Sequence, residues 1–369
     1  MFWRAALVLV PLSLVLAAIG GVPRTAVFVV SILAIIPLAE WVRRSTEHVA
    51  ARAGSAIGGL LNVSFGNAPE LILALFVLQG GHVAVVKAQI TGSLIGNSLL
   101  GLGLAIVAGS FGREVQHFNR ERAGLLSSLL ILVTIAVMLP ALFDYTERGV
   151  LRDPNTALLD ERLSLGVAIV LILVYIGNLI YTLVTHRDIF ARTPPTAPDS
   201  EPDVVDPWPL SRSMLVLAGA TALTALEAEL VSDTVEITAT RLGLTPFFLG
   251  VIVLAIVGNA AEYVSAVYFA RRGRMGLVMS ITVGSTIQIG LLVAPLLVIV
   301  SYLIGRPMNL VFGNPIELVA IAGAAFIVNS IAQDGETTWF EGLLLLAVYA
   351  LLALAFFFAT PNIPAHAMP

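Results

Sequence analysis

Two glutamates lie deep inside long apolar stretches of the chain, and each closes a copy of the same short motif. Residues 66–70 read GNAPE, and residues 258–262 read GNAAE, 192 positions later. A carboxylate without a partner inside a membrane costs at least ~2.5–3.5 kcal/mol, so Glu70 and Glu262 must each be protonated, paired or bound to a cation. The alternative, a neutral glutamic acid that only joins helices, would have to occur twice at matching positions. We therefore expect a cation or a proton to neutralise both glutamates.

Other oxygen-bearing side chains recur at fixed distances from these glutamates. Each motif has an asparagine three residues before its glutamate, which places the two side chains on the same face of a helix. The next apolar stretch of each half carries a serine followed, four or three residues later, by an amide side chain. Singly, such residues more often join helices by hydrogen bonds. Together they form a candidate ion site made of oxygen donors: Glu70, Glu262, Asn67, Asn259, Ser93, Asn97, Ser285 and Gln288.

The donor types favour a hard cation. Calcium takes about six to eight oxygen ligands at flexible distances, whereas magnesium demands a tight octahedron and keeps its waters. Zinc and copper would require cysteine or histidine; the chain has no cysteine, and its five histidines lie near or beyond the ends of the apolar stretches. Two glutamates balance one divalent charge, and protonation is the least costly way to neutralise them once the ion leaves. We expect exchange of calcium for protons, with Glu70 and Glu262 as the metal ligands and no cofactor.

The composition is that of an integral membrane protein. Of the 369 residues, 58% are hydrophobic and 12% are charged, and the mean hydropathy is +0.94, whereas soluble chains have about a quarter charged residues. The apolar residues come in runs of roughly twenty, which indicates spanning helices rather than the strands of an outer-membrane barrel. A net charge of −4 with scattered basic residues excludes nucleic acid as a partner, and the lipid bilayer is the expected surrounding.

The spans and their orientation follow from hydropathy and from the positions of basic residues. Thirteen Lys and Arg residues fall on one side of the predicted spans and seven on the other, so we expect a cytoplasmic amino terminus and an external carboxyl terminus. The first span is alternatively a signal peptide. We predict an all-α polytopic protein of the cell membrane of a prokaryote, with about eleven transmembrane helices at residues 5–22, 25–42, 55–79, 83–109, 123–143, 163–185, 213–235, 245–270, 276–303, 309–332 and 338–358.

The duplication extends beyond the two motifs, and its halves run in opposite directions. Matches continue from residues 92–93 to 284–285 at the same spacing, and they continue upstream at a spacing of 189. The motifs fall on the third and eighth predicted spans, an odd separation that reverses the second copy. Inverted-topology repeats are typical of secondary transporters, whose substrates bind near the midplane between the repeats. We predict an extra helix at 1–23, five-helix repeats at 24–186 and 213–369, and a proline-rich acidic cytoplasmic linker at 187–212.

Two further sets of acids are candidates for supporting roles. Glu40, Glu47, Glu229 and Glu236 occupy matching positions before the two motifs, and we predict that they line the vestibules and pass cations to the central site. The alternative is that they pair with nearby arginines at the membrane interface. A second set lies in the linker, which either tethers the halves as a solvated loop or attracts cations and regulates transport. The linker acids are Asp199, Glu201, Asp203 and Asp206.

These motifs make the chain resemble the cation/proton exchanger branch of the calcium:cation antiporter superfamily. The resemblance covers nearly the whole chain. It implies eleven helices, an acidic segment between the sixth and seventh, calcium and protons that share Glu70 and Glu262, and alternating access by movement of the first two helices of each repeat. The residues that carry it are 58–62 (GGLLN), 65–70 (FGNAPE), 92–97 (GSLIGN), 258–262 (GNAAE) and 284–289 (GSTIQI).

Two departures bear on the choice of ions. The sodium/calcium exchanger branch carries a small hydroxyl residue where this chain has Asn67 and Asn259, which favours protons over sodium as the counter-ion. A histidine commonly follows the second glutamate in the branch that the chain resembles, but here the residue is Tyr263, and a phenol does not exchange protons near neutral pH. A sodium/calcium or broader-specificity cation antiporter is the alternative. A channel would need no counter-ion, and an enzyme would need a nucleophile or a metal-bound water that no residue pattern provides.

Overall fold

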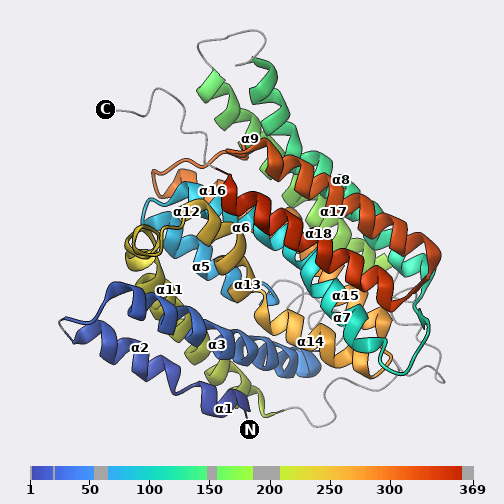
Figure 1. The fold of residues 1–369 in the computed structure, drawn as a ribbon, viewed down its shortest axis with the longest axis horizontal. Helices are drawn as coiled ribbons and strands as arrows, with labels where there is room; N and C mark the ends of the chain where they lie inside the picture. Colours follow the sequence, from blue (N-terminus) through green and yellow to red (C-terminus); the bar gives the residue numbers. More distant parts are fainter. Residues whose placement is uncertain (1, 20, 54–64, 148–155, 186–207, 360–369) are drawn as a thin grey trace.

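The structure, a computed structural model, describes residues 2–19, 21–53, 65–147, 156–185 and 208–359 (Figure 1). These residues are helical apart from loops and one antiparallel pair of short strands, β1 (Gln116–His117) and β2 (Glu336–Thr337). The first half contains α1 (Phe2–Ala6), α2 (Leu9–Ala18), α3 (Arg24–Ala53), α5 (Ala68–Gln79), α6 (Val83–Ile95), the π-helical turn η1 (Gly96–Gly101), α7 (Leu102–Gly109), α8 (Arg120–Asp144), α9 (Thr156–Ile180) and the π-helical turn η3 (Tyr181–Thr185). The second half contains α11 (Leu210–Leu242), α12 (Pro246–Phe248), the π-helical turn η5 (Leu249–Leu254), α13 (Ala255–Gly258), α14 (Ala260–Arg271), α15 (Met275–Gln288), the π-helical turn η6 (Ile289–Val293), α16 (Ala294–Leu303), α17 (Pro315–Asp334) and α18 (Trp339–Phe358).

The helices match the predicted polytopic arrangement. In the described part of the chain, eight helices are long and apolar enough to cross a membrane, and the bent pair Pro246–Gly258 and Ala260–Arg271 makes a ninth. Two shorter apolar helices, Trp3–Ala18 and Ala68–Gln79, lie where the sequence predicts the first and third spans. The all-α polytopic fold is therefore confirmed. The third predicted span starts at residue 55, but residues 54–64 lie outside the described part, and the helix that carries Glu70 begins at Ala68.

The two halves of the chain interlock. The long helices α3 and α11 lie side by side, with α2 against α3 (Figure 1). Helix α3 of the first half also contacts α13 and α14 of the second half, and α11 of the second half contacts α5 of the first. Each repeated motif is therefore covered by the long helix that precedes the other motif. The boundaries at 1–23, 24–186, 187–212 and 213–369 stay a prediction.

A glycine contact brings the halves together next to the motifs. A Cβ atom added to Gly92 on α6 would lie 1.9 Å from the carbonyl oxygen of Val251 on η5. The contact is reciprocal, because a Cβ atom on Gly250 would lie 2.6 Å from the carbonyl oxygen of Val85. Helices that approach so closely gain packing contacts that any larger residue would prevent. The position of α6 against the second half therefore depends on having no side chain at Gly92.

We expect Gly92→Ala to destabilise the protein. The added methyl group must force α6 and η5 apart, and overpacking of this kind typically costs about 1–3 kcal/mol. Thermal unfolding in detergent measures the effect as a lower midpoint. The control is Gly166→Ala on the exposed face of α9, where an added Cβ atom meets nothing within 4 Å and alanine is the better helix former. Equal midpoints for the two variants would contradict the proposed role of Gly92.

Candidate ion-binding site

Each repeated motif lies at the start of a helix. Asn67 and Asn259 are the N-cap residues of α5 and α14, with backbone angles outside the helical range, and at the second motif the chain bends by 52° between α13 and α14. Glu70 and Glu262 are each the third residue of the helix that follows. Each asparagine therefore precedes the first turn of its helix, and its glutamate lies within that turn. The positive end of the helix dipole at each helix start favours a negative charge there.

Each asparagine reaches across to the other repeat. Asn67 donates from Nδ2 to Oε1 of Gln288 at 2.8 Å, and its Oδ1 accepts from the hydroxyl of Ser285 at 2.7 Å. Asn259 donates from Nδ2 to Oγ of Ser93 at 3.0 Å, and its Oδ1 accepts from Nδ2 of Asn97 at 3.0 Å. The predicted donors thus meet in two crossed sets, in which the asparagine of one half binds the serine and amide of the other.

The carboxyl groups complete these two sets. Glu262 accepts from Nδ2 of Asn97 at 3.1 Å and contacts Oγ of Ser285 at 2.8 Å. Glu70 is 2% exposed, and its side chain lies against Gly258, where an added Cβ atom would be 3.6 Å from the glutamate Cβ and Cγ. The two motifs therefore cross with the glutamate of the first beside the glycine of the second. Glu70 also lies within hydrogen-bond reach of Ser93 and Asn259, so all eight side chains of the predicted site belong to the two connected sets.

Three oxygen atoms at the site are buried and have no hydrogen-bond partner among the described residues. They are Oε2 of Glu70, Oδ1 of Asn97 and Oε1 of Gln89. Buried polar atoms are normally paired, so such oxygens are suited to a ligand that supplies positive charge. Gln89, which donates to the carbonyl oxygen of Glu70 at 3.4 Å, was missed in the sequence analysis. Its signal was present, because it lies four residues before Ser93 on the same face of α6.

Irregular helical turns place the amide side chains. Asn97 lies in the π-helical turn η1, and Gln288 directly precedes the π-helical turn η6. At the repeat spacing of 192, Ser93 corresponds to Ser285, but Asn97 corresponds to Ile289, one residue past Gln288. Both amides nevertheless bind the opposite asparagine. Turns of this type are frequent at functional sites, and they change the face on which the following residues lie.

Tyr263 takes a structural place beside the second glutamate. Its ring lies so close to Gly96 and Gly101 that added Cβ atoms there would be 2.6 and 2.7 Å from it. The side chain is 6% exposed, and its hydroxyl has no hydrogen-bond partner among the described residues. These two glycines bound η1, so the phenol packs against the turn that carries Asn97. This contact gives a reason for a large flat residue at the position where a histidine was expected.

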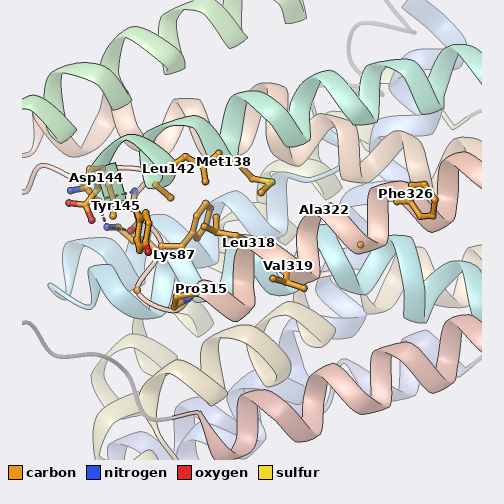
Figure 2. Close-up of a pocket in the computed structure, with 16 residues that line it drawn as sticks. Lys87, Met138, Leu142, Asp144, Tyr145, Pro315, Leu318, Val319, Ala322 and Phe326 are labelled. Atoms are coloured by element: carbon orange, nitrogen blue, oxygen red, sulfur yellow. Dashed lines mark hydrogen bonds between the residues drawn. The ribbon is translucent and has the colours of Figure 1, made fainter. Parts of the chain in front are cut away.

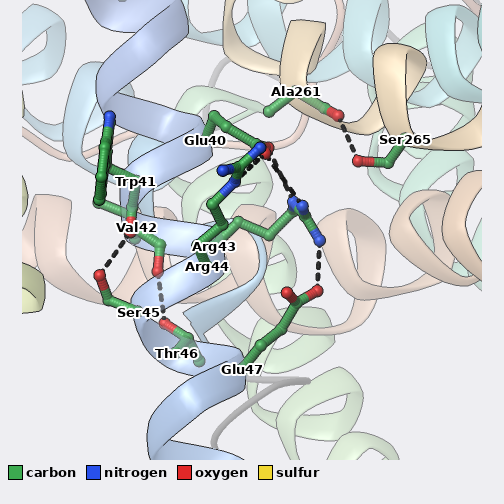
Figure 3. A network of polar contacts seen from close by, with 10 residues as sticks. All are labelled: Glu40, Trp41, Val42, Arg43, Arg44, Ser45, Thr46, Glu47, Ala261 and Ser265. Atoms are coloured by element: carbon green, nitrogen blue, oxygen red, sulfur yellow. Dashed lines mark hydrogen bonds and ion pairs between the residues drawn. The ribbon is translucent and has the colours of Figure 1, made fainter. Parts of the chain in front are cut away.

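A network of charges lies between α3 and α14. Glu40 is 3% exposed and accepts from Arg43 at 2.9 Å and from Arg44 at 2.5 Å, while Arg43 also pairs with Glu47 (Figure 3). Arg43 is near enough to Glu262 for the two charges to interact. The apolar stretches of the sequence offered no basic partner for the glutamates, because Arg43 comes from the continuation of α3 beyond its predicted end at residue 42.

The matching acids of the second half have different surroundings. Glu229 and Glu236 are exposed on α11, and Glu236 lies 3.0 Å from Nδ1 of His82. The buried acid on this helix is Glu227, which accepts from the hydroxyl of Ser13 at 2.5 Å. The pairing of Glu40 and Glu47 agrees with the alternative of arginine partners, and a role for the four acids in passing cations stays a prediction. Asp199, Glu201, Asp203 and Asp206 lie outside the described residues.

Comparison with known proteins gives consistent matches over nearly the whole chain. Residues 24–184 and 212–358 match the family described as sodium/calcium exchanger protein. The chain is 44% identical to a Ca(2+)/H(+) antiporter of Synechocystis sp. over 95% of this chain and 96% of that protein. It is 39% identical to the Ca(2+)/H(+) antiporter ChaA of Bacillus subtilis over 96% and 99%.

A solved structure shows the same fold. The structure described as native YfkE superimposes with a TM-score of 0.82 at 35% identity, covering 97% of this chain and 100% of that one. The sequence match, the identity of the relatives and the shared fold agree with one another. The chain belongs to the sodium/calcium exchanger protein family, and within it to the Ca2+/H+ antiporter branch of the calcium:cation antiporter superfamily.

Proposed function

We propose that this protein is a secondary active transporter that exchanges calcium for protons across the cell membrane. The observation that carries the proposal is the pair of buried glutamates, each in the first turn of a helix. Glu262 contacts Asn97 and Ser285, and Glu70 lies within hydrogen-bond reach of Ser93 and Asn259, so each glutamate meets oxygen-bearing side chains of both repeats. The relatives named Ca(2+)/H(+) antiporter support the same ions. The excess of basic residues on one side supports a cytoplasmic amino terminus.

The donor set suits calcium. Glu70 and Glu262 supply two negative charges, and the neighbouring amide and hydroxyl groups supply neutral oxygens, which is the ligand chemistry that calcium prefers. In the described residues, no group of three or more His, Asp and Glu side chains is arranged to hold a metal. Neutral oxygens must therefore complete the coordination. A site with only two carboxylates releases its ion more readily than a highly charged one.

Ser285 joins Asn67 to Glu262. Its hydroxyl oxygen lies 2.7 Å from Oδ1 of Asn67 and 2.8 Å from Oε1 of Glu262. A serine hydroxyl can donate to an ionised carboxylate and can accept from a protonated one. The contact with Glu262 can therefore be kept when a proton replaces the cation.

The interlocking of the halves supports alternating access. Helices α3 and α11 contact each other and lie across the motifs of the opposite repeats. We propose that this helix pair moves as one body relative to the remaining helices, so that it exposes Glu70 and Glu262 to one side and then to the other. Inverted repeats provide two such arrangements of similar energy. An empty site with two unpaired carboxylates is too costly to reorient, which couples calcium movement to proton movement.

We expect the purified protein in vesicles to take up calcium only with a matching movement of protons outward. Vesicles with an acidic interior and a trapped pH-sensitive dye should become more alkaline inside as external calcium enters. Sodium in place of the proton gradient should not support uptake. Calcium entry without any proton movement would contradict the proposal and indicate a channel, and entry driven by sodium would indicate a sodium/calcium exchanger.

We expect Glu70→Gln and Glu262→Gln each to abolish exchange. Glutamine keeps the size and hydrogen bonds of the side chain but can neither balance the calcium charge nor carry a proton. The dye assay should show proton flux at the level of protein-free vesicles, with the protein still inserted and folded. Glu227→Gln is the matched control, because it removes a buried carboxyl group away from the site, bonded to Ser13. Near-normal coupled transport in either site variant would contradict the mechanism.

Removal of a neutral ligand should have a milder effect. We expect Asn67→Ala and Asn259→Ala to raise the calcium concentration at half-maximal rate by roughly tenfold, the equivalent of about 1.4 kcal/mol, with the maximal rate largely retained. The control is Asn329→Ala on α17, which removes an amide bonded to Ser127 outside the site. If the two site variants change the calcium dependence no more than this control does, the asparagines do not bind calcium.

A further inference from the structure

A long apolar groove lies on the face formed by α8 and α17, away from the two glutamates. It has a volume of about 1120 Å³. Figure 2 shows Lys87, Asp144 and Tyr145 together at one end and Val319, Ala322 and Phe326 following one another along α17 toward the other. We propose that the groove binds one phospholipid of the bilayer, with the phosphate at Lys87, a headgroup amine toward Asp144 and an acyl chain along α17.

The dimensions of the groove fit a lipid. Its volume exceeds the roughly 300–1000 Å³ that is usual for pockets holding small molecules. From Pro315 to Phe326 the groove follows eleven residue steps of α17, which is about 16 Å at about 1.5 Å per residue. One leaflet occupies half of the ~30 Å hydrocarbon core, or about 15 Å. A chain that enters at the Lys87 end therefore reaches the middle of the membrane at Phe326.

The apolar part of the groove opens toward the bilayer. Val319 is 70% exposed and Phe326 is 71% exposed, although both lie on the spanning helix α17. Between them the groove is floored by Ala322 and Gly323, and a Cβ atom added to Gly323 meets nothing within 4 Å. A water-soluble ligand would have to cross lipid to reach this surface. An amphiphile that is already in the membrane has no such barrier, and its chain can fill the space above the two small residues.

The polar end carries groups of both signs. Lys87 donates to Oδ1 of Asn309 and, at 3.0 Å, to the carbonyl oxygen of Val311, which uses two of the three donors of its ammonium group. The charges of Glu317, Asp160 and Asp144 all act on Lys87, and of these three acids only Asp144 lines the groove. A headgroup with a phosphate and an amine is complementary to this pair of charges. A purely anionic headgroup would instead bring a second negative charge toward Asp144.

The groove is separate from the proposed ion pathway. None of the eight side chains of the predicted ion site lines it. The residue of the second repeat that corresponds to Lys87 at a spacing of 192 is Met279, so the polar end occurs only once and does not follow the symmetry of the ion site. The proposal therefore stands independently of which ions the protein exchanges.

Native mass spectrometry of the delipidated protein in detergent tests the proposal, with phosphatidylethanolamine and phosphatidylglycerol as probes. We expect one tightly bound phosphatidylethanolamine, held about tenfold more tightly than phosphatidylglycerol. Lys87→Gln should weaken binding about tenfold through loss of one charge-assisted hydrogen bond. Gly323→Leu, whose Cβ atom meets nothing within 4 Å and whose side chain occupies the groove, should reduce binding to the level of non-specific adducts.

Arg306→Gln is the matched control, because it removes an exposed positive charge from the loop between α16 and α17 at a position that does not line the groove, and its lipid binding should equal that of the parent. Three outcomes would overturn the proposal. If Gly323→Leu binds phosphatidylethanolamine as tightly as the parent does, the lipid does not bind in the groove. If the two lipids bind equally tightly, Lys87 and Asp144 do not select the headgroup. If glycerophosphoethanolamine, which has no acyl chain, competes fully, the acyl chain contributes nothing to binding.

Discussion

The negative charge of a carboxyl group buried in a membrane must be balanced in every conformation of the protein. The arrangement around Glu70 and Glu262 follows from this constraint. A helix starts beside each glutamate, which provides a dipole end and frees polar backbone groups where no water is at hand. The asparagine at each helix start turns toward the other repeat, so the neutral donors surround the charges from both sides. In the mechanism that we propose, the neutral donors stay in place and only the positive charge on the glutamates changes, between a proton and a cation.

The same arrangement requires the two halves to approach very closely. Amide and hydroxyl side chains are short, so helices that carry them must nearly touch if hydrogen bonds are to form between repeats. Gly92 and Gly250 allow this, because each faces a carbonyl oxygen of the opposite half at a distance that leaves no room for a side chain. Gly92 and the neighbouring Ser93 both lie on α6, so the close packing of this helix and the hydrogen bond between Ser93 and Asn259 depend on one another.

The sequence predicts the helical fold, the inverted duplication and the composition of the candidate site, because apolar runs and repeated motifs are local signals. It does not predict the helix break at Asn259, since the second motif has Ala261 where the first has Pro69, and the chain still bends there by 52°. The π-helical turns depend on packing between helices, and the spacing of apolar residues along the sequence does not reveal them. Arg43 was missed for a related reason, because α3 stays helical past the end of its apolar run.

The repeats agree in sequence more closely than in their surroundings, and this difference has a physical basis. Glu40 is buried among arginines of its own helix, whereas Glu229, its counterpart, is exposed, and the buried acid of α11 is Glu227, which accepts from Ser13 of α2. In the candidate site both halves contribute side chains to the same few hydrogen bonds, so a change in either half disturbs the other. Away from this site the long helices meet different neighbours, since α2 packs more extensively on α3 than on α11. The correspondence between the halves is therefore closest where they share hydrogen bonds and weaker where each helix has its own partners.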